Sequence, residues 1–340
     1  MFSELMDKGA RCASFKKRFF LSALICSVIG SLCLVAFAQD RSYPNRPVKI
    51  IVPFAAAGPS DMIGRAVATL LQDSLGQPFL VENRPGASGN VGALQVARAA
   101  PDGHTLLITG TSQFTTNPWL YKNPGYEFLK DFAAISQIAV APSVFVVHPA
   151  SGLKTMRDFI AMARAKTGQL NVGNSGVGSP PHIASELLKF EAGIQFAQLP
   201  YTGASLAVQA VLGRTLDASS TALPPAQGLI ESGRLIALAV TGSTRWAGLP
   251  NVPTMMESGF PDFVVESTFG LYGPAGMPIE IVQKLSRETL LGLSRVEAKE
   301  RLLNAGFEAR GAGPEQLRHL ILTNAPKFKA LIERAGIEMQ

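Results

Sequence analysis

One stretch, residues 171–182, constrains the fold of this 340-residue chain most, because it joins an apolar strand to an amphipathic helix through a loop of glycine and serine. Gly173, Gly176 and Gly178 can adopt backbone angles that other residues avoid, so successive N–H groups could converge on one point. Ser179 is placed as the N-cap of the helix, and Pro180 takes the first helical position. Such a helix N-terminus favours a carboxylate or a phosphate. An αβ turn without a ligand is the alternative.

The same arrangement occurs near the N-terminus of the chain. Residues 48–52 form a β-branched run, residues 54–61 are mostly small, and an apolar pattern of helical period covers 62–75. Ser60 or Asp61 is expected to cap this helix. Strands that alternate with helices in this way predict a parallel sheet, with ligands at the carboxyl ends of its strands.

A second α/β unit follows the first along the chain. Its expected strands cover 194–200, 216–220 and 235–241, and a helix covers 204–212. Strand-like runs at 135–139, 143–148 and 263–270 would carry the chain between the two units, and three further helices end it. We therefore predict an α/β fold with two lobes joined by two hinge strands, and a cleft between the lobes. The expected segments are a signal peptide (1–38), a discontinuous domain 1 (39–142 and 265–340) and domain 2 (143–264).

A polar loop is expected at 110–117, directly after a strand at 104–109. Its hydroxyl and amide groups could hydrogen-bond a ligand at the carboxyl end of that strand. Ordinary loop polarity explains the composition equally well.

The N-terminal segment has the pattern of a cleaved secretory signal peptide. Three basic residues at 16–18 precede an apolar run at 19–37, and an A-x-A site ends at Ala38. The run is also long enough for an uncleaved membrane anchor, which is the alternative. The cysteines Cys12, Cys26 and Cys33 all lie in this segment, so the mature, periplasmic protein is expected to have no disulfides.

The formal charge of +6 gives little support for a nucleic-acid partner. Residues 1–38 contain five basic and two acidic side chains, so the remainder carries only +3. Only 16% of the residues are charged, aromatic residues are few, and no basic cluster remains. We therefore expect no nucleic-acid binding.

No arrangement of residues predicts catalysis, a metal site or a cofactor. The sequence at 173–177 fails the G-x-S-x-G pattern, because Val177 replaces its second glycine. Neither a P-loop nor a dinucleotide fingerprint is present. The four histidines are isolated, without metal-ligand spacing. For His182, a hydrogen bond to its own loop and a contact with a ligand both remain open. The sequence predicts a binding protein rather than an enzyme.

Ten short motifs then resemble one family along nearly the whole mature chain. They include IVPF, GPSD, VENRPG, PYTG and LPNVPT; the ten lie at 43–47, 51–54, 58–61, 81–86, 101–103, 130–132, 176–182, 200–203, 237–241 and 249–254. In this order they resemble the extracytoplasmic solute-binding proteins of tripartite tricarboxylate transport systems, the Bug family.

This resemblance implies a two-domain periplasmic-binding-protein fold of type II topology. It implies a protein that captures a small carboxylate, such as a di- or tricarboxylate, an amino acid or an aromatic acid, for membrane permease subunits. We expect a monomer. A sensor without a transporter, or a secreted α/β hydrolase, are the alternatives.

Two strand-to-helix loops would hold one ligand carboxylate through backbone and hydroxyl groups. The implied site residues are Phe54, Ala55, Gly58, Ser60, Asp61, Thr111, Ser112, Asn174, Ser175, Val177, Gly178, Ser179, His182, Tyr201, Thr221 and Phe269. The sequence departs from the family at Ala56 and Ala57, where Pro-Gly or Gly-Gly is common, and at Phe269, where tryptophan is frequent.

Overall fold

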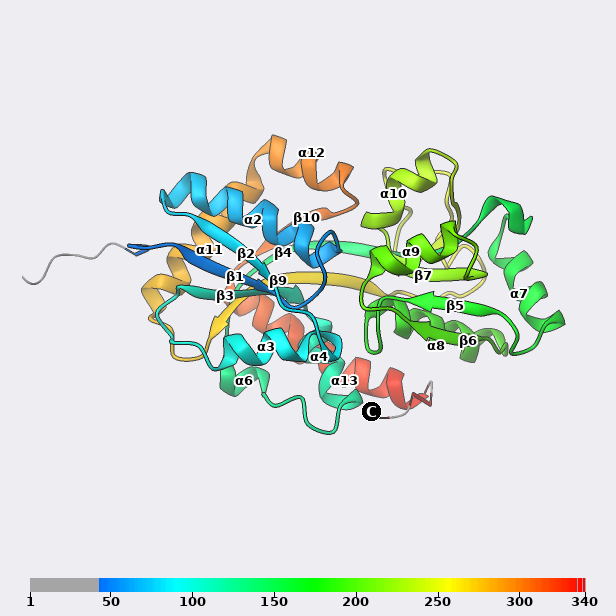
Figure 1. Ribbon diagram of the computed structural model, residues 1–340, viewed down its shortest axis with the longest axis horizontal. Coiled ribbons are helices and arrows are strands. Elements are labelled where there is room, and N and C mark those ends of the chain that lie inside the picture. Colours follow the sequence, from blue (N-terminus) through cyan, green and yellow to red (C-terminus); the bar gives the residue numbers. More distant parts are fainter. Residues whose placement is uncertain (1–42, 335, 338, 340) are drawn as a thin grey trace, which may run out of the picture. The chain divides into compact units, whose positions relative to one another are not determined.

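The computed structural model describes residues 43–334, 336–337 and 339 (Figure 1). The predicted signal peptide lies outside the described residues. The chain divides after Asn45, and every element below belongs to the part that begins at Arg46. Within the described residues, no helix combines the length and the apolar character needed to cross a membrane.

Strands and helices alternate along most of the chain. The strands are β1 (Val48–Val52), β2 (Phe79–Asn83), β3 (Thr105–Gly110), β4 (Phe132–Val147), β5 (Asn171–Asn174), β6 (Ala197–Pro200), β7 (Ala218–Ala222), β8 (Ile236–Val240), β9 (Glu266–Pro274) and β10 (Glu308–Ala312). The helices are α2 (Pro59–Leu75), α3 (Asn90–Ala97), α4 (Ser112–Thr115), α5 (Asn117–Leu120), α6 (Phe128–Asp131), α7 (Met156–Ala165), α8 (Pro180–Ala192), α9 (Ala204–Leu212), α10 (Pro224–Glu231), α11 (Ile279–Ser294), α12 (Val296–Asn304) and α13 (Pro314–Arg334). Two short 3₁₀ turns cover Ala87–Gly89 and Pro149–Ser151.

The described strands form one sheet in the order β2-β1-β3-β9-β4-β7-β5-β6, and β8 and β10 also pair with β4. Strand β1 is parallel to β2 and β3, and β5 is parallel to β6 and β7. The long strands β4 and β9 run antiparallel to their neighbours. The predicted parallel arrangement is therefore confirmed within each α/β unit, and the two connecting strands make the whole sheet mixed.

Strand β4 is continuous over 16 residues, whereas the sequence suggested two separate strands. It pairs with β9 from Phe132 to Pro142 and with β7 from Ser143 to Val147. Pro142 lies where the partner strand changes, and a missing N–H is tolerated best at such an interruption. Strand β4 thus belongs to both halves of the sheet, next to β9 in the centre of Figure 1.

Alternate residues of β4 pack into two different cores. Phe145 and Val147 join a cluster formed with α7 and α8. Val144 and Val146 join a separate cluster formed with α9 and α10. Since successive side chains of a strand point to opposite faces, one segment of β4 anchors helices on both sides of the sheet.

Helices also cover both faces of the half that contains β1. In Figure 1, α2 and α11 lie on one side of these strands, and α3 and α13 lie on the other. Every residue of β1 except Lys49 is fully buried, which explains its nearly unbroken β-branched run. A cluster of aromatic and aliphatic side chains, including Ile51, Phe114 and Tyr272, fills the side toward α3 and α13.

Several short elements were not predicted from the sequence. The expected polar loop at 110–117 is mostly helical, as α4 and α5, and Thr115, Thr116 and Asn117 are buried in it. Helices α6 and α10 and strand β10 were also not predicted. Strand β10 lacks the apolar alternation of a strand and is held by pairing with β4. Thr155 and Asp158 have the S/T-x-x-D sequence pattern that predicts a helix start, and α7 does begin there, because the two residues form a capping box.

Candidate functional site

The loop before α2 is closed by the carboxylate of Asp61. Asp61 Oδ2 accepts hydrogen bonds from the backbone N–H of Ala57 at 2.9 Å and from Arg65 Nε at 3.0 Å. Asp61 Oδ1 accepts a bond from Asn83 Nδ2 at 3.0 Å. The residue is only 3% exposed. The N-cap is Gly58, so the expectation that Ser60 or Asp61 would occupy that position is wrong; both lie in the first turn.

These hydrogen bonds determine the ionisation of Asp61. Burial alone raises the pKa of the carboxyl, but the hydrogen bonds from Arg65, Ala57 and Asn83 outweigh it and hold the pKa below its ordinary value of 3.8. The ionised form is therefore favoured by folding. Its stabilising contribution is complete above the pKa of the unfolded chain and is lost as the pH falls through the lower, folded pKa.

We expect Asp61→Asn to lower the free energy of unfolding at neutral pH by about 2 kcal/mol. The NH₂ group of the new asparagine would replace one carboxylate oxygen, so a neighbouring donor would lose its acceptor. The difference from the wild type should shrink as the pH falls below 3.8. Chemical denaturation over a pH series measures this. Asp73→Asn, an exposed change on the same helix, is the control and should be nearly neutral at each pH. A deficit that does not change with pH would contradict this role of the Asp61 charge.

Ala57 occupies a backbone conformation that favours glycine. Its φ is +60°, in the left-handed region, where a side chain costs roughly 1–2 kcal/mol. This is one of the two positions where the sequence departs from the family's glycine-containing pattern.

Ala57→Gly should therefore leave the free energy of unfolding unchanged or raise it by up to about 1 kcal/mol, the relief of strain being partly offset by greater freedom of the unfolded chain. Its neighbour Ala56 has an ordinary negative φ, so Ala56→Gly should lower stability by about 0.5–1 kcal/mol. Denaturant titration of both variants measures the contrast. Equal losses would show that Ala57 is unstrained.

The second strand-to-helix loop satisfies most of its own N–H groups. Gly176 N–H donates to Asn174 Oδ1 at 2.9 Å, and Gly178 N–H donates to His182 Nδ1 at 3.3 Å. Ser179 N–H donates to the carbonyl of Gly176 at 3.1 Å. The expected convergence of these glycine N–H groups on a ligand is therefore wrong. For His182, the hydrogen bond to its own loop is the observed arrangement.

The start of α8 is also poor in free donors. Ser179 is the N-cap, as predicted, and its Oγ accepts the N–H of His182. Pro180 and Pro181 have no N–H at all. This helix can therefore favour an anion through its dipole, but it offers no N–H from its first two positions.

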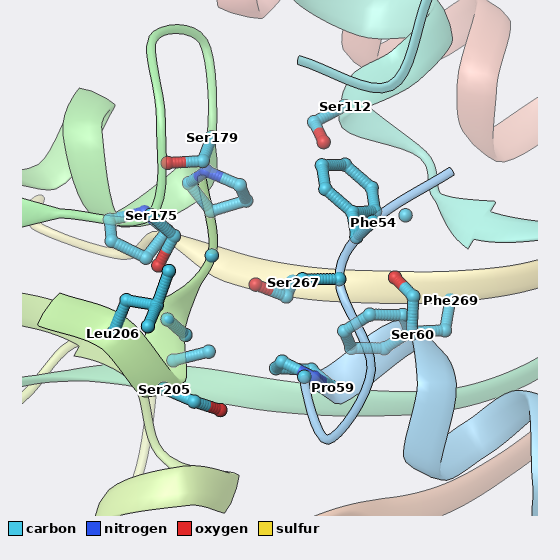
Figure 2. Close-up of a pocket in the computed structure, with 18 of the residues that line it drawn as sticks. Phe54, Pro59, Ser60, Ser112, Ser175, Ser179, Ser205, Leu206, Ser267 and Phe269 are labelled. Atoms are coloured by element: carbon cyan, nitrogen blue, oxygen red, sulfur yellow. The ribbon is translucent and has the colours of Figure 1, made fainter. Parts of the chain in front are cut away.

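A cavity of about 180 Å³ lies between the two loops (Figure 2). Ser175, Ser179, Ser205 and Leu206 come from one side, and Phe54, Pro59, Ser60 and Ser112 come from the other. Ser267 of β9 lies between these two sides, and Phe269 of the same strand lies on the side of Phe54 and Ser60. Eight hydroxyl side chains line the cavity; they belong to Ser60, Thr111, Ser112, Ser175, Ser179, Ser205, Ser267 and Thr268. Its size suits a small metabolite rather than a peptide.

Three helices of eight residues or more begin at this cavity. Gly58 to Ser60 at the start of α2, Ser179 to Pro181 at the start of α8, and Gly203 to Leu206 at the start of α9 all line it. Pro59, the first residue of α2, also lacks an N–H. The first-turn N–H groups without an acceptor in their own helix are therefore those of Ser60 and Asp61 in α2 and those at the start of α9. Each terminus carries roughly half a positive charge, so the cavity favours a negatively charged group.

A second cavity, also of about 180 Å³, adjoins the first and shares Phe54 and Ser175 with it. Its other walls are the loops at 85–89, 176–177 and 200–202, together with Pro53. The buried Oγ of Ser175, between the two cavities, has no hydrogen-bond partner among the described residues. That hydroxyl is available to a bound molecule.

The loop at 85–89 has an unusual backbone that a buried network supports. Ala87 and Ser88 both have positive φ, of +45° and +48°. Asn90 Oδ1 accepts hydrogen bonds from Gln113 Nε2 at 2.7 Å, Asn117 Nδ2 at 2.8 Å and Tyr126 OH at 2.6 Å. Asn117 also donates to the carbonyl of Ser88 at 3.1 Å, which connects the network to the cavity wall.

The structure brings most of the predicted site residues together. Those that line the first cavity are Phe54, Ala55, Gly58, Ser60, Thr111, Ser112, Ser175, Ser179 and Phe269. Val177 and Tyr201 line the second cavity. The remaining five are Asp61, Asn174, Gly178, His182 and Thr221, which line neither cavity. Asp61, Asn174 and His182 instead bond to the loops, and Thr221 is fully buried in β7.

Sequence reasoning missed the contribution of α9. Gly203, Ala204, Ser205 and Leu206 all line the first cavity, and Ser205 Oγ donates to the carbonyl of Ala57 at 2.8 Å, joining the two sides. The signal was present, since a strand, a glycine and a helix start follow one another at 197–204 as in the other two loops.

Within the described residues, no group of three or more His, Cys, Asp or Glu side chains could hold a metal ion.

Comparison with known proteins gives a consistent result. A family model described as "Tripartite tricarboxylate transporter family receptor" matches residues 63–337. The chain is similar to Protein BugT of Bordetella pertussis, being 32% identical over 321 residues that cover 94% of this chain and 98% of that protein.

Two solved structures are similar over nearly the whole described part. One is the structure of R. palustris Rpa4515 with adipate. Its sequence is 30% identical, its TM-score is 0.86, and the match covers 88% of this chain and 100% of that chain. The other is MatC from Rhodopseudomonas palustris with bound malate, which is 29% identical with a TM-score of 0.80 and covers 85% of this chain and 100% of that chain. A third solved structure, that of periplasmic binding protein BugD, is 33% identical with a TM-score of 0.84 and covers 88% of this chain and 100% of that chain. The likeness to these structures confirms the predicted two-lobed α/β periplasmic-binding-protein fold.

Proposed function

Because this chain belongs to the tripartite tricarboxylate transporter receptor family of periplasmic solute-binding proteins, we propose that it captures a small carboxylate for a membrane permease of that transport class. The observation that carries the proposal is the convergence of three helix N-termini and eight hydroxyl side chains on one cavity. Together they supply positive dipole ends and hydroxyl groups without a bound cation, and two of these hydroxyls, those of Ser179 and Ser205, already donate to the carbonyls of Gly176 and Ala57. The ligands named for the two structural neighbours, adipate and malate, are carboxylates, which agrees with this chemistry.

We further propose that the two sides of the cavity are two lobes that close on the ligand. Residues 39–142 and 265–340 would form one lobe, and 143–264 the other. The change of partner along β4 at Pro142 and Ser143 supports this division. The bond from Ser205 to the carbonyl of Ala57 would be one of the contacts made on closure.

The proposal includes export to the periplasm through residues 1–38, with cleavage near Ala38. It also includes direct contact of the ligand with the predicted site residues that line the two cavities. A sensor of the same fold that feeds no permease is the alternative function.

A thermal-shift screen of small carboxylates, followed by calorimetry and small-angle scattering with the best compound, tests the proposal. A ligand at 100 times its Kd should stabilise the protein by about 2.7 kcal/mol. Closure should also make the particle more compact. Retention of the carboxylate unchanged is expected, and its chemical turnover would refute a purely binding function. If binding occurs but loss of the gene leaves cellular uptake of that compound unchanged, the sensor function is favoured.

A further inference from the structure

The C-terminal helix α13 contains a proline between two parts that pack in different places. Pro326 lies inside the helix, where it removes one backbone hydrogen bond and favours a kink. Before it, Leu317 and Ile321 are buried in the core beside β1 and β3. After it, Leu331 packs against the core formed with α7 and α8. The helix therefore contacts both proposed lobes, with Pro326 between the two contacts.

The end of α13, residues 328–334, is buried against helices of both proposed lobes. Ile332 is 4% exposed and packs in one cluster with Leu120 of α5 and Ile183 of α8. In Figure 1 this end of α13, in red, lies next to α8. Because α5 and α8 belong to different proposed lobes, the cluster can persist only while the two helices stay close together.

Two cations extend these contacts, one to each of the two helices. Lys329 Nζ lies 4.8 Å from the ring centroid of Trp119 in α5. Arg334 Nη2 donates to Glu191 Oε1 of α8 at 3.4 Å, and its guanidinium carbon lies 4.9 Å from the ring centroid of Phe190. The side chain of Glu191 is only 16% exposed, so solvent screens this ion pair less than a fully exposed one.

The cluster around Ile332 adjoins the second cavity. Val177 packs against the cluster and also lines that cavity. Leu120 faces the same loop, since its Cδ1 would lie 3.0 Å from a Cβ added to Gly178. A movement that opens the space between the two strand-to-helix loops would therefore also separate α5 from α8 and break these contacts.

From these contacts we propose that residues 328–334 form a C-terminal clasp, which holds the two lobes closed without touching the ligand. The proposal rests on the proposed function, because a clasp has a role only if the lobes open and close. None of residues 328–334 lines either cavity. The clasp therefore raises the population of the closed form, which increases the affinity for every ligand by the same factor and slows its release.

Reversing the charge of Arg334 tests the clasp without removing a buried apolar side chain. Arg334→Glu replaces the ion pair with Glu191 by repulsion, to which the nearby charge of Asp262 adds. Calorimetry on the purified mature protein uses four acids of different classes, namely adipate, malate, glutamate and benzoate. We expect the Kd to rise at least about fivefold, by the same factor for each acid that the wild type binds.

The kinetics should show where this loss of affinity arises. The rate of acid release, measured by stopped-flow fluorescence, should rise by the same factor as the Kd, and the rate of association should stay the same. A residue of the ligand site would not change all acids equally.

Two further variants are the matched controls. Arg334→Glu combined with Glu191→Arg restores an ion pair between α13 and α8, so the double variant should recover most of the lost affinity. Lys327→Glu makes the same change of charge at an exposed residue of α13 just before the clasp, and should leave the Kd unchanged.

The outcomes separate the clasp from the function on which it rests. If Arg334→Glu binds each acid as tightly as the wild type, or if the double variant recovers no affinity, the clasp is wrong and carboxylate capture stands. Losses that differ from one acid to another would also overturn the clasp, because they would mean that the ligand site itself had changed. If the wild type binds none of the four acids, carboxylate capture fails, and the clasp fails with it.

Discussion

Replacing Gly178 by valine should weaken carboxylate binding at least about tenfold and lower the free energy of unfolding by about 3 kcal/mol. Gly178 has a φ of +80°, which a β-branched residue rarely adopts. A Cβ here would lie 3.0 Å from both Asn117 Oδ1 and Leu120 Cδ1 of α5. The added atoms would therefore push the loop at 174–179 away from α5 and move Ser175 and Ser179 in the cavity wall. Calorimetry and chemical denaturation measure the two effects.

Gly168→Val is the matched control. Gly168 has a similar φ of +74°, but nothing lies within 4 Å of an added Cβ. This variant should lose stability through backbone strain and bind normally. If both variants bind equally well, the position of the loop at 174–179 does not determine affinity.

Removing the acceptor of Asn90 should lower the free energy of unfolding by about as much as Gly178→Val. Asn90→Ala leaves the buried donors of Gln113, Asn117 and Tyr126 without their shared acceptor. Tyr126 OH can still donate to the carbonyl of Gln113 at 3.2 Å, whereas the amides of Gln113 and Asn117 each lose one of their two acceptors. At about 1–3 kcal/mol for each lost acceptor, we expect a loss of about 3 kcal/mol. Denaturant titration measures this loss.

Asn171→Ala, an exposed asparagine at the start of β5, should change stability by less than about 0.5 kcal/mol. The Asn90 variant should also bind carboxylates less tightly, because Asn117 holds the carbonyl of Ser88 in the wall of the second cavity. A loss below about 1 kcal/mol would mean that other groups replace the Asn90 acceptor.

Local patterns in the sequence predicted the elements whose stability is local. Ser179 is the N-cap of α8, and Thr155 and Asp158 form a capping box, because each cap involves residues within one turn of a helix. Strands with β-branched runs, such as β1, were recognised for the same reason. Strand β10 was missed because its partner, β4, lies more than 150 residues away in the sequence.

The site was predicted in outline and not in detail, since its hydrogen bonds join distant segments. Asp61 is of a residue type that often caps helices, yet one of the groups that donate a hydrogen bond to it belongs to Asn83, 22 positions away. Ser205 reaches the carbonyl of Ala57 across 148 positions. The glycines of the loop at 174–179 suggested a set of free N–H groups, but those of Gly176 and Gly178 are taken by side chains of Asn174 and His182.

A crystal structure of the protein grown with its tightest-binding small carboxylate would show directly whether the ligand is captured between the two strand-to-helix loops. We expect the ligand carboxylate to lie in the first cavity and to accept hydrogen bonds from hydroxyl or N–H groups at the starts of α2 and α9, with Ser175 close by. Residues from both sides of the cavity should contact the ligand. A carboxylate held instead by a lysine or arginine, or contacted from only one side, would contradict capture between two strand-to-helix loops.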